Sequence, residues 1–574
     1  MKSNTWRGII LNKKLAKTLG ISGVASMLAV VTLAGYGPSS AAAFVSPKHA
    51  AKPSSTHPIG GTLSTIGGPH GTWVDENNPY SPSANDNPAA GIVYEPLIQW
   101  NSANGKYMPW LATGWQWNST NTVLTINLRH GVKWSNGTPF TSADVAFTFN
   151  MMKKYPSTDF NGLWSYLKSV TTDGPYAVKI TLIQPSSMFF YYISQTPIVP
   201  AAIWSKENPV TWTDPQPIGT GPYTLQTFTP ESITMIRNPH YWQAPKPYLA
   251  KVVFPSELSN TSTILSLAQN QIQWSGTFSF DLQRSYVSKA PQYNHVGLYP
   301  NGMNILWVNL HKYPLNMPVV RQAISMTINR TAMANISWSG YSPAVTNLTG
   351  VTPGMASTWS TPALAKKYKV VYDPTAAKKM LLKAGFKMGA NGMLLTPKGT
   401  PFNISIDVPT PFSDDVAASQ LISQELNQIG INATLQDNSR NAYYSKLQLG
   451  QFDIAVSWSP WGANPFFTLY PSMSQTYSAP FGKYAVENFG RYNNPEVQTL
   501  GKQFLHTYSQ SQQVPIVLKL QQIFASQLPI IPLTYRNTPI EYSTKNIAGW
   551  PTQANPYWNL NEGNLPVLVN LYWK

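Results

Sequence analysis

The stretch SDDVAASQLISQELNQIGINATLQ (residues 413–436) decides the fold class of this chain. Its first part, which Ser413 opens and Gly430 closes, has the spacing of an amphipathic helix. The apolar face of that helix carries Val416, Leu421, Ile422, Leu426 and Ile429. INATLQ (431–436) and FDIAVSW (452–458) follow as predicted strands, because apolar and small or polar residues alternate in them. Strands that alternate with a helix are typical of mixed α/β lobes.

The strand FDIAVSW ends among many aromatic residues. Pro460, Gly462 and Pro465 interrupt the backbone hydrogen-bond ladder there, and Trp458 and Trp461 flank the interruption. An interrupted strand leaves backbone N–H and C=O groups available, and aromatic rings supply flat apolar walls, so together they suit a concave binding site. The alternative is that the rings pack in an ordinary core, which we expect for Phe466, Phe467 and Tyr470.

The rest of the chain has a strand-rich first half and a more helical second half. GGTLSTIGG (60–68) is a predicted strand between glycines, and residues 92–200 contain short strands separated by turns. Within that region Thr141 and Asp144 have the spacing of a capping box at the start of a helix. DPTAAKKMLLKAGF (373–386) is predicted to be a helix capped by its first residue.

The composition excludes several kinds of chemistry. The chain has 574 residues, of which 43% are apolar, so it should fold as two or more lobes. It has no cysteine, which excludes disulfides, thiolate zinc sites and cysteine nucleophiles. The net charge is +17, but Lys and Arg form no sustained stripe, so we expect a solvated surface and no nucleic-acid face. The scarcity of acids and the lack of cysteine also suit an acidic exterior.

Residues 1–43 are a predicted secretory signal peptide. They carry five basic residues and no acid, then an apolar run at 21–35, then small residues that end at Ala43. Cleavage after Ala43 fits the A-x-A rule, whereas a retained segment would act as an anchor. The run of about 15 residues is shorter than the ~20 that span a bilayer. Tyr36 stands where a lipoprotein signal has its lipidated cysteine, so no lipid is expected there. Residues 44–59, rich in Pro, Ser and Ala, are a predicted disordered leader.

Enzyme signatures are missing from the sequence. The eight histidines include no H-E-x-x-H and no pair at metal-ligand spacing, and there is no G-x-S-x-G or G-x-x-x-x-G-K. Asp414 and Asp415 are adjacent acids, but they fall in the first turn of a predicted helix, where the dipole favours negative charge. We therefore interpret them as structural, and expect neither a cofactor nor a metal. A secreted hydrolase with two distant acids is the alternative of another class.

Seven segments spread along the chain match, in order, the motifs of one protein family. They are GGTLSTIGG (60–68), VYEPLIQW (93–100), LTINLRHGVKWSNGTPFTSADVAFTF (124–149), PIGTGPYTLQTF with IRNPHYW (217–242), VVRQAISMTINR (319–330), YDPTAAKKMLLKAGF (372–386) and LPIIPLTY (528–535). On these segments the chain resembles the extracytoplasmic solute-binding proteins of ABC importers, family 5, the oligopeptide/dipeptide/nickel-binding group.

The resemblance implies an α/β, two-lobed periplasmic-binding-protein-like fold (type II, large class) with an extra β-rich domain on the N-terminal lobe. The implied N-terminal lobe comprises residues 60–95, 200–304 and 531–574, the additional small domain 96–199, and the C-terminal lobe 305–530. The lobes are expected to close around a small solute without covalent chemistry, so we do not expect an enzyme. The implied partners are an ABC permease and its ATPase subunits, at the periplasmic or extracellular face of the cytoplasmic membrane. No nucleic acid is expected as a partner, and the chain is expected to be monomeric.

The resemblance also implies the two walls of a ligand site. In the family, the strand that matches FDIAVSW enters the cleft between the lobes, and the loop after it contacts the ligand. The residues at these places are Trp458, Ser459, Trp461, Gly462 and Asn464. The opposite wall is expected in the loop after the first strand, at Gly68, His70 and Gly71, with Trp274 as a further candidate.

The sequence departs from peptide-binding relatives at two charged positions. Those relatives commonly have an Asp in the loop, which pairs with the α-ammonium of a peptide, and some have an Arg on the strand. Here the corresponding places hold Gly462 and Val456. An unpaired buried charge costs several kcal/mol, so either another residue supplies the acid or the ligand is neutral at this end. An oligopeptide is the expected ligand. An oligosaccharide, stacked on Trp rings and hydrogen-bonded to Asn464, is the alternative.

Overall fold

A ten-stranded sheet forms the frame of the protein in the computed structural model, which describes residues 57–81, 87–102, 105–507, 509–552, 554–561 and 564–574. The predicted signal peptide, Tyr36 and nearly all of the predicted leader lie outside the described residues. The strand order is β16 (Asn432–Asn438), β15 (Asn403–Pro409), β17 (Ile454–Trp458), β12 (Asn294–Val308), β18 (Ile530–Ser543), β11 (Trp274–Ser275), β1 (Gly60–Ile66), β10 (Leu249–Pro255), β9 (Ser232–Arg237) and β8 (Tyr223–Thr229).

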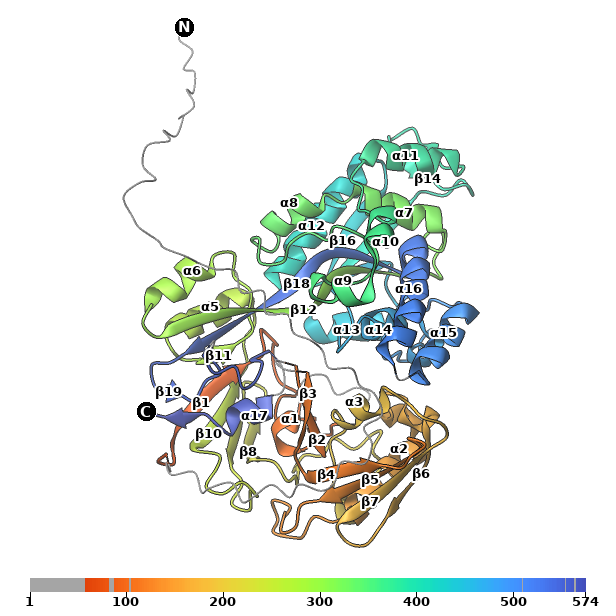
Figure 1. Cartoon of the computed structure of the whole chain (residues 1–574). Coiled ribbons are helices and arrows are strands. Elements are labelled where there is room, and N and C mark those ends of the chain that lie inside the picture. Colours follow the sequence, from red (N-terminus) through yellow and green to blue (C-terminus); the bar gives the residue numbers. More distant parts are fainter. Residues whose placement is uncertain (1–56, 82–86, 103–104, 508, 553, 562–563) are drawn as a thin grey trace, which may run out of the picture. The chain divides into compact units, whose positions relative to one another are not determined.

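Two long antiparallel strands, β12 and β18, join two lobes. They pair from Asn294 opposite Ser543 to Trp307 opposite Ile530. The C-terminal lobe contains β15, β16 and β17 on one side of this pair, and the N-terminal lobe contains β11, β1, β10, β9 and β8 on the other (Figure 1). The two-lobed α/β fold expected from the sequence is therefore confirmed.

The C-terminal lobe contains the strand–helix–strand units that residues 413–458 predict. Helix α12 (Ser413–Gln428) connects the parallel strands β15 and β16, and α13 (Arg440–Leu449) returns the chain to β17, which pairs parallel to β15. Parallel neighbours need a crossover of this kind, and both faces of such a sheet are covered by helices. Ile422 and Leu426 of α12 are fully buried against this sheet, as their spacing predicts.

Further helices cover the C-terminal lobe and the edge of the N-terminal lobe. They are α5 (Asn260–Ala268), α7 (Pro318–Thr327), α8 (Arg330–Ile336), α10 (Pro362–Lys367), α11 (Pro374–Lys383), α14 (Phe466–Met473), α15 (Pro495–Leu505) and α16 (Gln510–Gln527). Asp373 caps α11, because its Oδ1 accepts a hydrogen bond from the Ala376 N–H at 2.8 Å. Within the described residues, no helix has the length and apolarity that crossing a membrane requires.

A separate four-stranded antiparallel sheet lies in the strand-rich first half of the chain (Figure 1). Its strands, in order, are β4 (Ala112–Trp117), β5 (Val123–Leu128), β7 (Ala177–Leu182) and β6 (Leu167–Thr172). Helix α2 (Ser142–Lys154) packs on this sheet and begins with the predicted capping box, in which the Thr141 N–H donates to Asp144 Oδ2 at 2.9 Å. The loop after β7 reaches the C-terminal lobe, where the Ser187 N–H donates to the Leu505 carbonyl at 3.1 Å.

Two fully buried carboxylates lie in the N-terminal half of the frame. Glu95 accepts hydrogen bonds from Trp110 Nε1 (2.7 Å), Tyr241 OH (3.2 Å) and Trp242 Nε1 (3.0 Å). Glu541, on β18, accepts one from the Thr277 N–H at 3.0 Å. Burial raises the pKa of Glu95 to about 7 and that of Glu541 to about 8.

These raised pKa values predict a protein that is more stable in mild acid than in mild base. Both lie above those of the unfolded chain, so between about pH 5 and pH 8 the folded state binds more protons. We expect the free energy of unfolding, measured by urea denaturation, to fall by a few kcal/mol over this range. Glu541→Gln should flatten the dependence, and a wild-type protein that is less stable at about pH 5 than at pH 8 would contradict this account.

Candidate ligand-binding site

A cavity of about 400 Å³ lies between the two lobes. The N-terminal lobe lines it with the end of β1, the loop after β1, and β11, while the C-terminal lobe contributes the start of α12 and the end of β17. β18 supplies the segment from Arg536 to Ile540 between them. Four tryptophans line the cavity: Trp73, Trp274, Trp338 and Trp458. The site is thus a concave, aromatic space at the junction of the lobes.

The register of the central strands brings Trp458 and Arg536 together. Trp458 and Thr534 both pair with Asn304 of β12, from opposite sides. Arg536 lies two residues beyond Thr534, hence on the same face of the sheet. Its guanidinium lies 4.8 Å from the centre of a Trp458 ring, which is cation–π geometry. The site therefore has a cation fixed on an aromatic wall.

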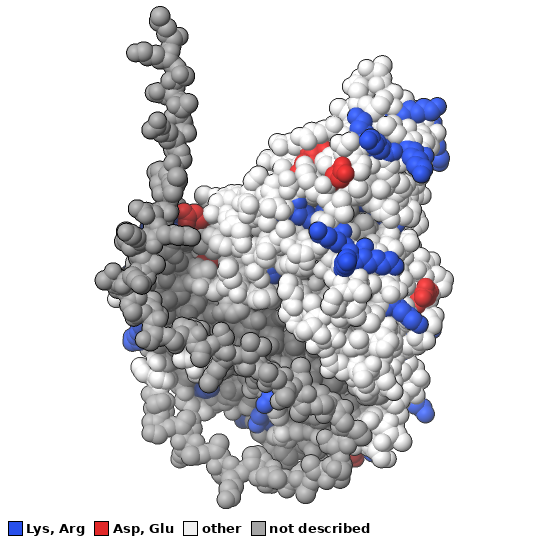
Figure 2. Space-filling view, turned by 45° about the horizontal axis from the view of Figure 1, so that its top comes forward, with Lys and Arg blue, Asp and Glu red and all other residues white. Residues whose placement is uncertain are grey.

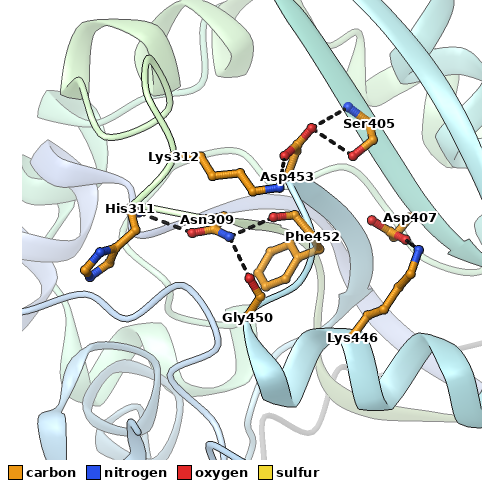
Figure 3. Close-up of polar contacts among 9 residues, drawn as sticks. All are labelled: Asn309, His311, Lys312, Ser405, Asp407, Lys446, Gly450, Phe452 and Asp453. Carbon is orange, nitrogen blue, oxygen red and sulfur yellow. Dashed lines mark hydrogen bonds and ion pairs between the residues drawn. The ribbon is translucent and has the colours of Figure 1, made fainter. Parts of the chain in front are cut away.

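A polar network holds β17, and with it Trp458, in position (Figure 3). Asn309 Nδ2 donates to the carbonyls of Gly450 (3.0 Å) and Phe452 (2.7 Å), just before the strand begins. Asp453 is paired with Lys312 and also accepts hydrogen bonds from the N–H and Oγ of Ser405, both at 2.8 Å. These contacts attach the start of β17 to β15 and to the end of β12. They fix the register of β17, and therefore the position of its last residue, Trp458, at the cavity.

Two adjacent acids, Asp414 and Asp415, line the cavity from the first turn of α12. Asn260, at the start of α5, donates from Nδ2 to Asp414 Oδ1 at 3.1 Å, so this contact links the two lobes. Burial raises the pKa of Asp414, while burial and the nearby charge of Asp414 raise that of Asp415 well above its usual value. Burial also lowers the pKa of Arg536, against the attraction of the two acids. Burial and mutual repulsion thus disfavour full ionisation of the pair, and a further cationic group beside it would favour the ionised form.

Of the nine residues that the sequence analysis names for the site, four line the cavity: Gly68, His70, Trp274 and Trp458. His70 stacks on Trp73 with ring centres 4.1 Å apart, and its Nε2 lies 2.8 Å from Arg440 Nη1 of α13, across the lobes.

The other five lie outside the cavity lining and have contacts that fix the backbone. Ser459 exchanges hydrogen bonds with Met303, through its N–H at 2.8 Å and its Oγ at 3.1 Å. Asn464 Oδ1 accepts from the Phe466 N–H at 3.0 Å, which starts α14. Trp461 packs beside Gly302, Gly462 packs against the Phe467 ring, and the Gly71 N–H donates to the Glu257 carbonyl at 3.0 Å. As expected, Phe466, Phe467 and Tyr470 are buried.

Several lining residues were missed by the sequence reasoning. Asp414 and Asp415 do lie in the first turn of a helix, as interpreted, but that turn also faces the cavity. The first turn of α12 thus brings two acids to the cavity, whereas the loop after β17 has glycine at position 462. Arg536 directly follows the motif LPIIPLTY, and nothing in its sequence neighbourhood distinguishes it from a surface cation.

Among the described residues, no cluster of three or more His, Asp or Glu side chains is arranged to hold a metal ion.

The fold and the interlobe cavity define a class: solute-binding proteins of the extracytoplasmic face, which serve ABC transporters. Residues 106–480 match the profile of the bacterial extracellular solute-binding proteins, family 5 (middle region), and the chain belongs to this family. It is 24% identical over 474 residues to the glutathione-binding protein GsiB of Escherichia coli O6:K15:H31 (strain 536 / UPEC), which covers 79% of this chain and 85% of that protein.

Two solved structures illustrate the likeness. A mannohexaose-bound periplasmic oligopeptide-binding protein of an oligopeptide ABC transporter from Thermotoga maritima is 26% identical, with a TM-score of 0.81, and the match covers 89% of this chain and 98% of that one. The binding protein DppA of Helicobacter pylori, in complex with the peptide STSA, is 21% identical with a TM-score of 0.75, covering 90% and 98%. The second comparison shows the fold alone.

The buried acid pair predicts a stabilising substitution in the site. Asp415→Asn removes a carboxylate whose ionisation is opposed by burial and by Asp414, so we expect a higher melting temperature than wild type at about pH 8. The gain should shrink as the pH is lowered, because protonation removes the charge of wild-type Asp415. Asp437→Asn removes an exposed carboxylate and serves as the control. It should leave the melting temperature unchanged at about pH 8 and at the lower pH. A lower melting temperature for Asp415→Asn at about pH 8 would show that its charge is stabilised.

Proposed function

We propose that this chain captures an oligopeptide in the interlobe cavity and delivers it to the permease of an ABC importer. The observation that carries the proposal is the acid pair Asp414–Asp415, which shares the cavity with Arg536. A cavity with both signs of charge is complementary to a zwitterion, whereas a neutral ligand would add no positive charge beside the two carboxylates, of which Arg536 can balance only one.

The acid pair would bind the α-ammonium of the peptide. One ammonium beside the two carboxylates would offset the repulsion that raises the pKa of Asp415. Asn260 already holds Asp414 from the opposite lobe, so a ligand bound there would contact the lobe junction. A ligand beside Asp414 contacts both lobes only when the lobes are closed. Its binding would therefore favour the closed arrangement.

The backbone of the N-terminal wall suits a peptide main chain. Gly67 and Gly68 follow β1, and Gly276 follows β11, all on the cavity surface. Gly68 has a φ of +134°, and a Cβ there would lie 3.1 Å from the Gly276 carbonyl oxygen, so this close approach needs glycine. A wall without side chains can hydrogen-bond the repeating peptide groups whatever the ligand sequence. Gly68, His70, Trp274 and Trp458 are the predicted residues that we retain as ligand contacts.

An oligosaccharide is the second candidate. The Thermotoga maritima protein described above is bound to mannohexaose, and four tryptophans line the cavity of this chain. Trp faces stack on sugar rings, and Asn and Asp side chains hydrogen-bond hydroxyl groups. A neutral sugar would, however, add no positive charge to the acid pair beyond that of Arg536.

A melting-temperature panel separates the two candidates, since a ligand bound only by the native state raises the apparent stability. We expect a tetrapeptide with a free N-terminus to raise the melting temperature at about pH 7. Its N-acetylated form should lose most of that shift, because acetylation removes the ammonium, and mannohexaose should give none. A shift with mannohexaose and none with either peptide would replace the oligopeptide by the oligosaccharide.

Substitution of single tryptophans tests the location of the site. Trp458→Ala removes the wall under Arg536 and should weaken binding of the best panel ligand by more than tenfold, about 1.4 kcal/mol. Trp461→Ala, three residues further and outside the cavity lining, should change the dissociation constant by less than about threefold. Isothermal titration would measure both. Equal losses in the two variants would move the site toward the loop after β17.

A further inference from the structure

One segment of the C-terminal lobe carries a concentrated positive charge. Between residues 366 and 398 the chain has eight lysines, no arginine and one acid, Asp373, which gives +7 of the total +17. We found no sustained stripe of Lys and Arg along the chain, but this segment is an exception. The lysines are Lys366, Lys367, Lys369, Lys378, Lys379, Lys383, Lys387 and Lys398.

The structure places this charge on an outer face of the lobe. The segment comprises the end of α10, helix α11 and the hairpin of β13 (Lys387–Met388) with β14 (Leu394–Leu395). All eight lysines are exposed except Lys378, which is half-buried. Figure 2 shows Lys and Arg side chains gathered on the side of the molecule where Figure 1 places α10 and α11. The ion pairs found among the described residues involve Lys179, Lys312 and Lys446, so none of them neutralises this set.

Apolar side chains stand among these lysines. On α11, Leu382 is 40% exposed and lies one turn after Lys378 and Lys379, on the same helix face. Met388, next to Lys387, is 41% exposed. Just before the helix, Val371 and Tyr372 are 51% and 50% exposed. We call the exposed residues of 366–388 the lysine face; it combines cations with side chains that water solvates poorly.

We propose that the lysine face docks the protein on an anionic lipid bilayer. Lysines near a membrane surface are attracted by anionic headgroups, and exposed apolar side chains gain by entering the interfacial layer. A soluble polyanion would satisfy the lysines but would offer nothing to Leu382, Met388, Val371 and Tyr372. The mixture of the two side-chain types therefore favours a lipid surface as the partner.

Docking through this face leaves the ligand cavity open. No residue of 353–400 lines the cavity, so the bilayer and the solute use different surfaces. The contact would hold the protein at a membrane without a lipid anchor, for which Tyr36 supplies no thiol. The proposed membrane docking does not depend on which ligand the cavity binds. Either this proposal or the oligopeptide proposal can therefore fail without affecting the other.

Sedimentation with lipid vesicles tests the proposal, with the chain as it is exported by an expression host. We expect binding to vesicles of phosphatidylglycerol and phosphatidylcholine, no binding to phosphatidylcholine alone, and release by salt. The variant Lys379→Gln/Lys383→Gln/Lys387→Gln should bind at least about tenfold more weakly. The matched control Lys168→Gln/Lys206→Gln/Lys502→Gln removes the same charge from exposed lysines elsewhere and should bind like wild type. Unchanged melting temperatures would show that both variants are folded.

A second variant distinguishes lipid from other polyanions. Leu382→Ser/Met388→Ser keeps every lysine, and it should weaken vesicle binding while leaving retention on a heparin column unchanged. The proposal is overturned if wild type ignores anionic vesicles, or if the two lysine variants bind them equally. It is also overturned if Leu382→Ser/Met388→Ser binds vesicles like wild type, because the face would then be a general polyanion surface.

Discussion

The hydrogen-bond ladder between β12 and β18 is the constraint on which the rest of the structure depends. It is the centre of the ten-stranded sheet, and each lobe adds its own strands to one side of it. Its register fixes Arg536 near Trp458, because both strands beside β12 pair with Asn304. β12 has register shifts between Pro300 and Met303 and between Asn304 and Ile305, beside the cavity. Irregularities of this kind re-aim side chains, and here they lie where the lobes meet.

The charged groups of the cavity are held at a cost in stability. Asp415 is only 5% exposed, its like-charged neighbour Asp414 lines the same cavity, and their pKa values are raised by burial. A core chosen for stability alone would not contain this pair. Such groups are typical of functional sites, and a second positive charge beside them is what the α-ammonium of the proposed oligopeptide would supply.

Local structure was largely predictable from the sequence. The apolar spacing in residues 413–429 gives α12 as observed, and the capping patterns at Thr141 and Asp373 start α2 and α11. Periodicity and capping involve residues within one or two turns of each other, so neighbours in the sequence suffice to encode them. The site was predicted only in part. The interrupted strand and the family's cleft loop led to both Trp458 and Trp461, but of these two only Trp458 lines the cavity; the motif match led to Gly68, which also lines it.

The sequence by itself determined the family, the α/β class, the lack of cysteine chemistry and the concentration of lysines in one segment. Only the tertiary structure decided what the charged residues face. Asp414 and Asp415 look like ordinary first-turn acids until the lobes pack, and Arg536 looks like a surface cation until β18 is paired with β12. The physical reason is that a charge interacts through space. Its partners and its exposure to water are set by strands and helices far away in sequence, which no local pattern records.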